Sequence, residues 1–132
     1  MPLFLTTIEL FTHSSPDWAK SDEPLIMEFC SRGICCFTNK LDNPTINDFE
    51  VGAHDTFSGS SLLGDCRNLE ISLSDLQAFV HATGNDGWYG QRAILRFDKG
   101  SSLSCPINRN IDGDVSAVSE TTSHVSARIF CF

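Results

Sequence analysis

A run of oxygen-bearing side chains in the stretch NDFEVGAHD is the part of the sequence best suited to hold a cation. Asn47, Asp48 and Glu50 lie close together, and a hard divalent cation such as calcium prefers several oxygen ligands, some of them carboxylates. On a strand, Asp48 and Glu50 would share one face. Asp22 and Asp86, in two other acidic segments, are candidates to complete the ligand shell. The alternative is an ordinary solvated acidic edge.

A second oxygen-rich stretch is NRNIDGDVSAVSE, in which Asn108, Asn110 and Asp112 alternate before a glycine. This pattern resembles the first half of an EF-hand loop. The twelfth position is Ser119, where an EF-hand carries a bidentate Glu, and no helical pattern flanks the stretch. We therefore expect a turn around Asp112 within a β-protein.

Motifs for catalysis are missing from the sequence. It contains no G-x-S-x-G, no H-E-x-x-H and no P-loop. His54 and Asp55 are adjacent, so on a strand their side chains would point apart. We expect a protein that is not an enzyme.

The cysteine count is high for 132 residues. No C-x-x-C pair is present and the four histidines are scattered, which argues against a structural zinc site. An even number favours disulfides and a secreted, extracellular location, although the sequence cannot choose the pairing. The alternative is a cytoplasmic protein with buried, reduced thiols. The disulfide candidates are Cys30, Cys35, Cys36, Cys66, Cys105 and Cys131.

Short apolar runs between turn-forming clusters must position these groups. Many short strands with regular turn signals indicate an all-β sandwich or barrel. One stretch, residues 74–81, has helical character, with Ser74 as its cap. The predicted strands are residues 3–11, 25–30, 34–38, 47–57, 63–73, 88–97, 103–105 and 125–132. The second and third of these are expected to form a hairpin across Ser31-Arg32-Gly33.

Length and charge narrow the function. The length suits a single domain over residues 1–132. The formal net charge of -8 argues against nucleic acid, because a surface that neutralises phosphates needs clustered Lys and Arg. It also argues against polybasic attraction to anionic lipid, unless a divalent cation lies between protein and membrane.

The order of these features resembles the PLAT domain, also called LH2. The resemblance is closest to the N-terminal C2-like β-sandwich domain of animal lipoxygenases. It covers about residues 3–114, and residues 115–132 extend past it as a C-terminal extension. The matching positions, in chain order, are Trp18 with Ser21-Asp22, Leu41-Asp42-Asn43-Pro44, Asn47 through Asp55, Leu63-Gly64, Asn85-Asp86 with Trp88-Tyr89, and Leu103-Ser104-Cys105.

The resemblance implies an antiparallel eight-stranded β-sandwich with a calcium cofactor. By the same resemblance, Asn47, Asp48 and Glu50 are calcium ligands, and Asp22 and Asp86 serve nearby sites. Calcium-ordered loops of such domains bring exposed aromatic side chains to a lipid surface.

The resemblance also implies which aromatic side chains meet lipid. Trp18 is the expected lipid-inserting residue, with a partly buried loop anchor as the alternative, and Phe79 is a candidate for a second apolar tip. Trp88 lies at the start of a predicted strand, so it is expected in the core or at the sheet edge rather than in lipid, and Phe57 is expected in the core. A second family Trp is absent, because residues 106–110 carry Asn in its place.

These considerations predict a non-catalytic, calcium-dependent module that binds a membrane lipid surface or a protein partner. No lipoxygenase or lipase catalytic domain is present in these residues, so those activities are not carried over. The alternative function is that of a secreted, disulfide-stabilised protein ligand, such as a toxin, defence or matrix component.

Overall fold

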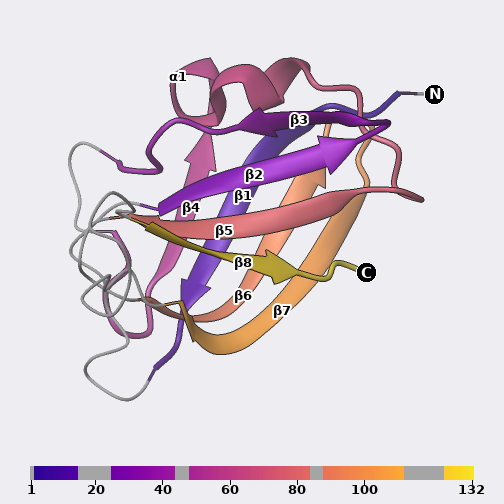
Figure 1. The fold of residues 1–132 in the computed structure, drawn as a ribbon. Helices are drawn as coiled ribbons and strands as arrows, with labels where there is room; N and C mark the ends of the chain where they lie inside the picture. Colours follow the sequence, from indigo (N-terminus) through magenta and orange to yellow (C-terminus); the bar gives the residue numbers. More distant parts are fainter. Residues whose placement is uncertain (1, 15–24, 44–47, 84–87, 112–123) are drawn as a thin grey trace.

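In the part of the chain that the structure describes, eight strands form two four-stranded antiparallel sheets that face each other (Figure 1). The structure is a computed structural model that describes residues 2–14, 25–43, 48–83, 88–111 and 124–132. One sheet has the strand order β4-β1-β6-β7 and the other β3-β2-β5-β8. The elements are β1 (Leu5–Thr12), β2 (Leu25–Ser31), β3 (Ile34–Phe37), β4 (His54–Ser58), α1 (Ser60–Leu63), the 3-10 turn η2 (Gly64–Asn68), β5 (Gln77–Thr83), β6 (Trp88–Phe97), β7 (Ser102–Ile111) and β8 (His124–Ile129). The predicted all-β antiparallel sandwich is therefore confirmed.

The core lies between the two sheets and follows from side-chain alternation. Along β2, Leu25, Met27 and Phe29 are buried, and the residues between them are only partly buried. Ile8 and Leu10 sit between the sheets from β1. Burying one such apolar side chain contributes about 1.5–3 kcal/mol, so this alternation fixes which face of each strand turns inward.

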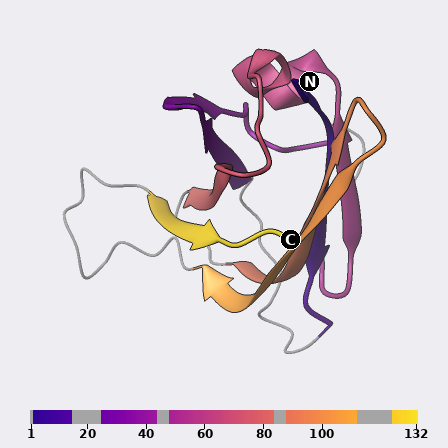
Figure 2. The same ribbon diagram turned by 90° about the vertical axis from the view of Figure 1, so that its right-hand side faces the viewer.

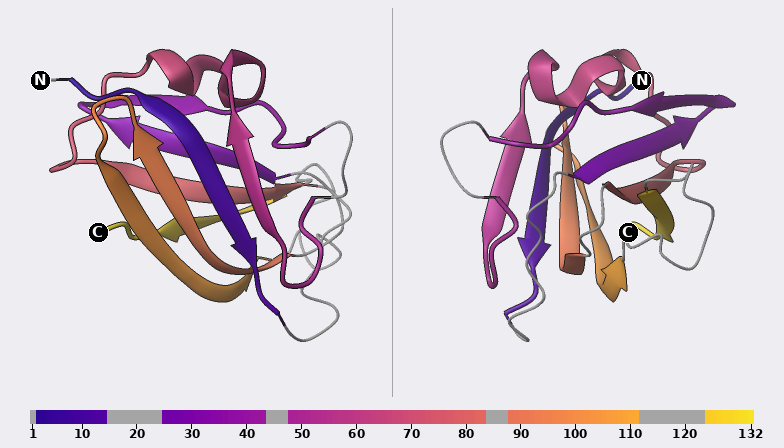
Figure 3. Two further views of the ribbon diagram at one scale, coloured as in Figure 1. Left: turned by 180° about the vertical axis from the view of Figure 1, so that it is seen from behind. Right: turned by 60° about the vertical axis from the view of Figure 1, so that its left-hand side comes forward.

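Two disulfides close the sandwich along its two long sides. On one side, Cys36 of β3 is bonded to Cys66 of η2, and the helical segment lies between β4 and β3 (Figure 3). On the other side, Cys105 of β7 is bonded to Cys131, just after β8. In Figure 2 this C-terminal segment runs against β7, and Ser104 and Phe132 exchange backbone hydrogen bonds there.

A tight hairpin joins β2 to β3, as the sequence predicted. Its two turn residues, Arg32 and Gly33, both have positive φ, at 56° and 78°, which suits the twist of an antiparallel pair. The hairpin brings Cys30 opposite Cys35, and these two form the third disulfide. All six cysteines are therefore paired, which confirms the prediction of disulfides.

Three predicted elements were wrong. Residues 63–73 were expected as a strand, but they contain the end of α1, then η2, and then a single bridge from Ile71 to Leu3. Gly59 and Gly64, both with positive φ, bend the chain around this helical segment. Residues 74–81 were expected to be helical, but β5 occupies most of them because it pairs with β2 on one side and β8 on the other.

The third correction concerns the strand predicted over residues 47–57. The strand there starts at His54, since Phe49 and Gly52 have φ of 64° and 73° and interrupt the extended backbone. Asp48 and Glu50 are therefore loop residues, and the shared strand face expected for them does not form.

Candidate cation and surface-binding site

Three aromatic rings hold the segment that leads into β4. Trp88 is fully buried, and its indole Nε1 donates a hydrogen bond to Thr12 Oγ1 at 2.8 Å. The Phe49 ring packs against Trp88 and Phe57, with centroid distances of 5.9 and 5.6 Å. A Cβ on Gly90 would lie 2.4 Å from the Trp88 ring, so only glycine fits beside the indole. Phe57 is a core residue, as predicted, and of the two alternatives for Trp88 the structure shows the core position.

The left-handed backbone at Phe49 is held by a neighbouring carboxylate. Bulky residues adopt positive φ rarely, because Cβ then crowds the following carbonyl. Here Asp55 Oδ2 accepts the Phe49 N–H at 2.7 Å, and burial of the Phe49 ring adds to the restraint. A turn then follows, in which the Ala53 N–H bonds to the Glu50 carbonyl at 2.9 Å.

Asp48 joins this segment to the chain that follows β3. Its carboxylate accepts hydrogen bonds from the backbone N–H and the side-chain amide of Asn43. The same amide also donates to the Thr56 carbonyl at 3.2 Å. Asp48 is only 9% exposed, so its charge is placed where water is scarce.

Burial and a neighbouring carboxylate disfavour the charge of two carboxylates at this end of the sandwich, Asp42 and Asp48. Loss of solvent, a hydrogen bond with Asp48 and the charge of Asp48 raise the pKa of Asp42 above its ordinary value. Burial is the largest influence on Asp48, and together with the charge of Asp55 it raises that pKa even though the Asn43 hydrogen bonds lower it. We call Asp42, Asp48 and Asp55 the acidic cluster; a cation at it would offset the repulsion.

The structure brings some of the predicted site residues to this end. Asp48 is in the acidic cluster, and Glu50 follows it, partly buried. The other predicted residues Trp18, Asp22, Asn47 and Asp86 lie outside the described residues. His13 lies at the same end, since its backbone bonds to Tyr89 and Gly52.

Three predicted positions, Phe79, Asn108 and Asn110, lie in strands rather than in loops. Phe79 lies in the middle of β5, half-buried, opposite Glu28 and Arg128 on the outer sheet face rather than at a loop tip. Asn108 and Asn110 of the EF-hand-like stretch are strand residues of β7. The Asp112 turn lies outside the described residues.

Sequence reasoning missed the roles of Asp42, Asn43 and Asp55. The available signal was the Asp42-Asn43-Pro44 run, because Asp and Asn side chains often bond to nearby backbone N–H groups in turns. Asp55 gave a weaker signal, since its inward position depends on where β4 begins.

A second charged group lies on the outer face of the β4-β1-β6-β7 sheet. Glu9 is bonded to Arg96 and to His54, the latter at 2.7 Å. Burial alone would raise the pKa of Glu9, but the hydrogen bonds and charges of these two partners lower it overall. Beside them, Phe11 lies between His54 and the Arg92 guanidinium, at 4.1 and 4.4 Å. Within this group the Arg96 guanidinium offsets the charge of Glu9.

Comparison with known proteins identifies the fold. No protein-family model matches the sequence. The alpha-toxin of Clostridium perfringens from an avian strain shares the fold with a TM-score of 0.71 and 18% identity, over 98% of this chain and 32% of that one. The alpha toxin of Clostridium absonum has a TM-score of 0.64 and 21% identity, over 94% of this chain and 31% of that one. Coral 8R-lipoxygenase has a TM-score of 0.66 and 18% identity, over 96% of this chain and 17% of that one. That enzyme is described as activated by calcium through a C2-like domain.

These likenesses establish the C2-like β-sandwich and confirm the predicted resemblance to the PLAT domains of lipoxygenases at the level of fold. The chain spans about a third or less of the length of these proteins. Within the described residues, no helix has the length and apolar character needed to cross a membrane.

Proposed function

We propose that this C2-like sandwich is a non-catalytic module that binds a lipid surface in a calcium-dependent way, through the loops at the acidic-cluster end. Calcium would be held by oxygen ligands from Asp48 and Glu50, with Asn47, Asp22 and Asp86 as the further candidates. Trp18 is the residue we assign to the lipid surface. The three disulfides support an extracellular location, where calcium is plentiful and disulfides persist.

The observation that carries the proposal is the acidic cluster. Asp48 is 9% exposed, accepts a hydrogen bond from Asp42 when that carboxyl is protonated, and is affected by the charge of Asp55. Once Asp42 also ionises, this arrangement is unfavourable without a compensating cation. Asp48 accepts two hydrogen bonds from Asn43, and an ionised carboxylate has further lone-pair directions. The donor set is all oxygen, which suits calcium rather than zinc. The calcium activation described for coral 8R-lipoxygenase through its C2-like domain also supports a calcium site in this proposal.

The charge of the protein explains why the cation would be required. At a formal net charge of -8 the chain is repelled by anionic headgroups. Calcium bound among the loop carboxylates reverses the local charge and lets an indole reach the interface, where its apolar ring and N–H donor are both accommodated.

Vesicle sedimentation tests the proposal. The protein is mixed with phosphatidylcholine–phosphatidylserine vesicles, with millimolar calcium or with chelator. We expect the protein in the pellet only with calcium, and Trp18→Ala to reduce the pelleted fraction while the circular dichroism spectrum stays unchanged. Equal sedimentation of wild type and Trp18→Ala removes Trp18 from the mechanism.

A second candidate function follows from the cysteines. All six are in disulfides, so the sandwich is also suited to be a rigid extracellular scaffold that binds a protein partner. Absence of vesicle binding both with calcium and with chelator would favour this protein-ligand function.

A further inference from the structure

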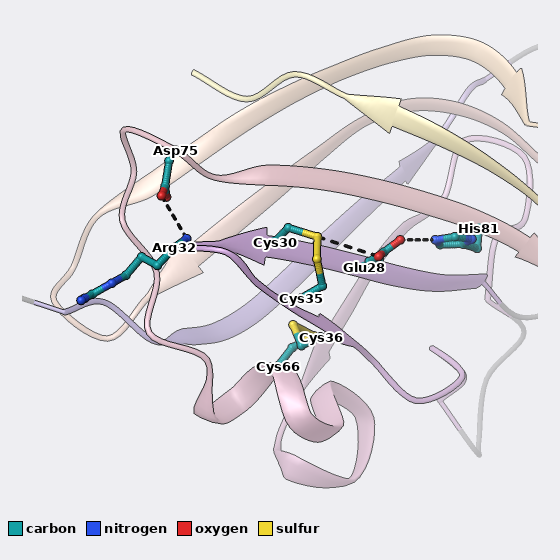
Figure 4. The surroundings of a disulfide bond; sticks show 8 residues. All are labelled: Glu28, Cys30, Arg32, Cys35, Cys36, Cys66, Asp75 and His81. Carbon is teal, nitrogen blue, oxygen red and sulfur yellow. Dashed lines mark hydrogen bonds and ion pairs between the residues drawn. A yellow bond between two sulfur atoms is a disulfide. The ribbon is translucent and has the colours of Figure 1, made fainter.

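The outer face of the β2–β3 hairpin gathers two sulfur atoms and a carboxylate. Glu28 and Cys30 are two residues apart on β2, so they share a face, and Cys35 is directly opposite Cys30 on β3. The Glu28 oxygen and the two Sγ atoms all lie within 4.8 Å of one another. Figure 4 shows the carboxylate pointing along the strand toward the disulfide.

A histidine fixes the direction of this carboxylate. His81 Nε2 lies 3.0 Å from Glu28 Oε1, and the other oxygen, Oε2, lies 3.8 Å from Cys30 Sγ (Figure 4). Both side chains are mostly covered, with exposed fractions of 11% for His81 and 19% for Glu28. The oxygen that faces the sulfurs is therefore held in place by a contact on its far side.

Of the three disulfides, Cys30–Cys35 is the most accessible to a reductant. Cys35 is exposed and Cys30 partly exposed, whereas Cys66 and Cys105 are completely buried in their own disulfides. Thiol–disulfide exchange requires an attacking thiolate to reach a sulfur atom, so exposure favours this bond.

The hairpin would keep the two cysteines together after the bond opens. Cys30 and Cys35 are a facing pair in a ladder that continues on both sides, from Glu28 opposite Phe37 to Ser31 opposite Ile34. The turn is also tied down from outside, because Asp75 accepts hydrogen bonds from Ser31 Oγ at 2.7 Å and from the Arg32 N–H at 2.9 Å.

We propose that reduction of Cys30–Cys35 converts this face into a binding site for a thiophilic divalent cation such as zinc. A dithiol reductant supplies two electrons and two protons, the S–S bond breaks, and the reductant leaves as its own disulfide. The cation then displaces the two thiol protons. The ligands are Cys30 Sγ, Cys35 Sγ and Glu28 Oε2, with water in the fourth position, and His81 is a positioning residue.

The chemistry of the donor set selects this class of metal. Zinc takes tetrahedral sites of thiolate sulfur at about 2.3 Å and carboxylate oxygen at about 2.0–2.2 Å. Two thiolates at that bond length stand roughly 3.8 Å apart, which a facing hairpin pair reaches by rotating its side chains. Calcium, which prefers oxygen, would not compete here, so this site is independent of the proposed calcium function.

The first measurement is selective reduction followed by metal titration. The folded protein is treated with limiting dithiothreitol, and the free thiols are alkylated and mapped. We expect Cys30 and Cys35 to be labelled first. Cobalt(II) added to the reduced protein should give a thiolate charge-transfer band at one equivalent, and zinc should abolish it by displacement. Earlier labelling of Cys36, Cys66, Cys105 or Cys131, or absence of the band, overturns the proposal.

Substitutions then assign the ligands. Cys30→Ser/Cys35→Ser should abolish the band while leaving the fold intact, and a band that persists in this variant places the metal elsewhere and overturns the site. Glu28→Gln should weaken cobalt binding roughly tenfold or more, the scale on which groups around a metal act. Glu70→Gln is the matched control, because it removes an exposed carboxylate bonded to Arg32, and its affinity should equal that of the wild type. No change in Glu28→Gln removes the carboxylate ligand.

The positioning role of His81 is tested by rescue. His81→Phe should weaken cobalt binding while the oxidised variant stays folded, and His81→Gln, which keeps an N–H donor toward Glu28, should restore part of the affinity. Equal affinity for His81→Phe and wild type overturns this role.

Discussion

Thr12 and Trp88 are joined by a side-chain hydrogen bond between two neighbouring strands, with the indole nitrogen 2.8 Å from the threonine oxygen. Both residues are buried, so no water replaces the acceptor if it is lost. Thr12→Val keeps the shape but leaves the indole N–H unsatisfied, which should lower the free energy of unfolding by about 1–3 kcal/mol. Urea denaturation measures the loss. Thr56→Val, at an exposed position, should change stability far less, and equal effects would contradict the assignment.

Calcium should raise the melting temperature, because a ligand that binds only the folded state stabilises it by mass action. Glu50→Ala should reduce the shift at millimolar calcium while leaving the calcium-free melting temperature nearly unchanged. Asp48→Ala should reduce the shift and also lower the calcium-free value, since Asp48 holds Asn43. Differential scanning calorimetry with calcium and with chelator checks both variants, and Glu70→Ala is the exposed control. A shift that is the same in all four proteins would contradict the assignment.

The acidic cluster should make stability depend on pH in a defined direction. The pKa values of Asp42 and Asp48 are raised in the folded protein, so ionising these carboxyls lowers the free energy of unfolding. This loss of stability is absent below the unfolded pKa and grows as pH rises through the folded pKa. Asp42→Asn should therefore stabilise the calcium-free protein at neutral pH, and this gain should disappear as pH falls toward about 4. The gain should stay below about 1 kcal/mol, because Asp42 is exposed and its charge is screened.

Denaturation of wild type and Asp42→Asn at several pH values separates the effect of Asp42 from the pH dependence that Glu9 contributes to stability. The pKa of Glu9 is lowered, so its contribution is present above its unfolded pKa and lost as pH falls through the folded value, equally in both proteins. If the difference in free energy of unfolding between the two proteins grew on acidification, the raised pKa of Asp42 would be contradicted.

The disulfides should differ in how much they stabilise. Cys105–Cys131 closes 26 residues of chain and Cys30–Cys35 only 5. By loop-closure entropy, Cys105→Ala/Cys131→Ala should lower the free energy of unfolding by about 3.5 kcal/mol, and Cys30→Ala/Cys35→Ala by about 2 kcal/mol. Chemical denaturation without reductant gives both values. The reverse order would show that the hairpin bond is the more important one for the fold.

The parts of the fold that the sequence predicted well are those whose signal is local. Side-chain alternation marks β2 and β6, and Gly33 marks the hairpin between β2 and β3. The misassigned β5 has the opposite character, because its strand conformation depends on partners far away in the chain, β2 and β8. The strand predicted over residues 63–73 was wrong for a similar reason, because the disulfide from Cys66 to the distant Cys36 anchors a helical segment against β3.

In the candidate site, too, some residues could be predicted from local sequence and others could not. Asp48 and Glu50 were predicted from residue type and spacing, but their geometry was not, because a left-handed residue between them turns the backbone. The partners Asn43 and Asp55 contribute through hydrogen bonds to backbone groups, and those depend on the finished turn. The ligand roles of Asp48 and Glu50, with those of Asp22, Asn47 and Asp86, stay predictions.

The covalent closure of both long sides has a mechanical consequence. If the chain is pulled from its two ends, the segments between Cys36 and Cys66 and between Cys105 and Cys131 cannot lengthen while their disulfides are intact. Each segment, with separations of 30 and 26 residues, hides on the order of 100 Å of contour length. Under tension the oxidised domain would therefore extend less than the reduced domain, because somewhat under half of its 132 residues stay inside the two closed loops.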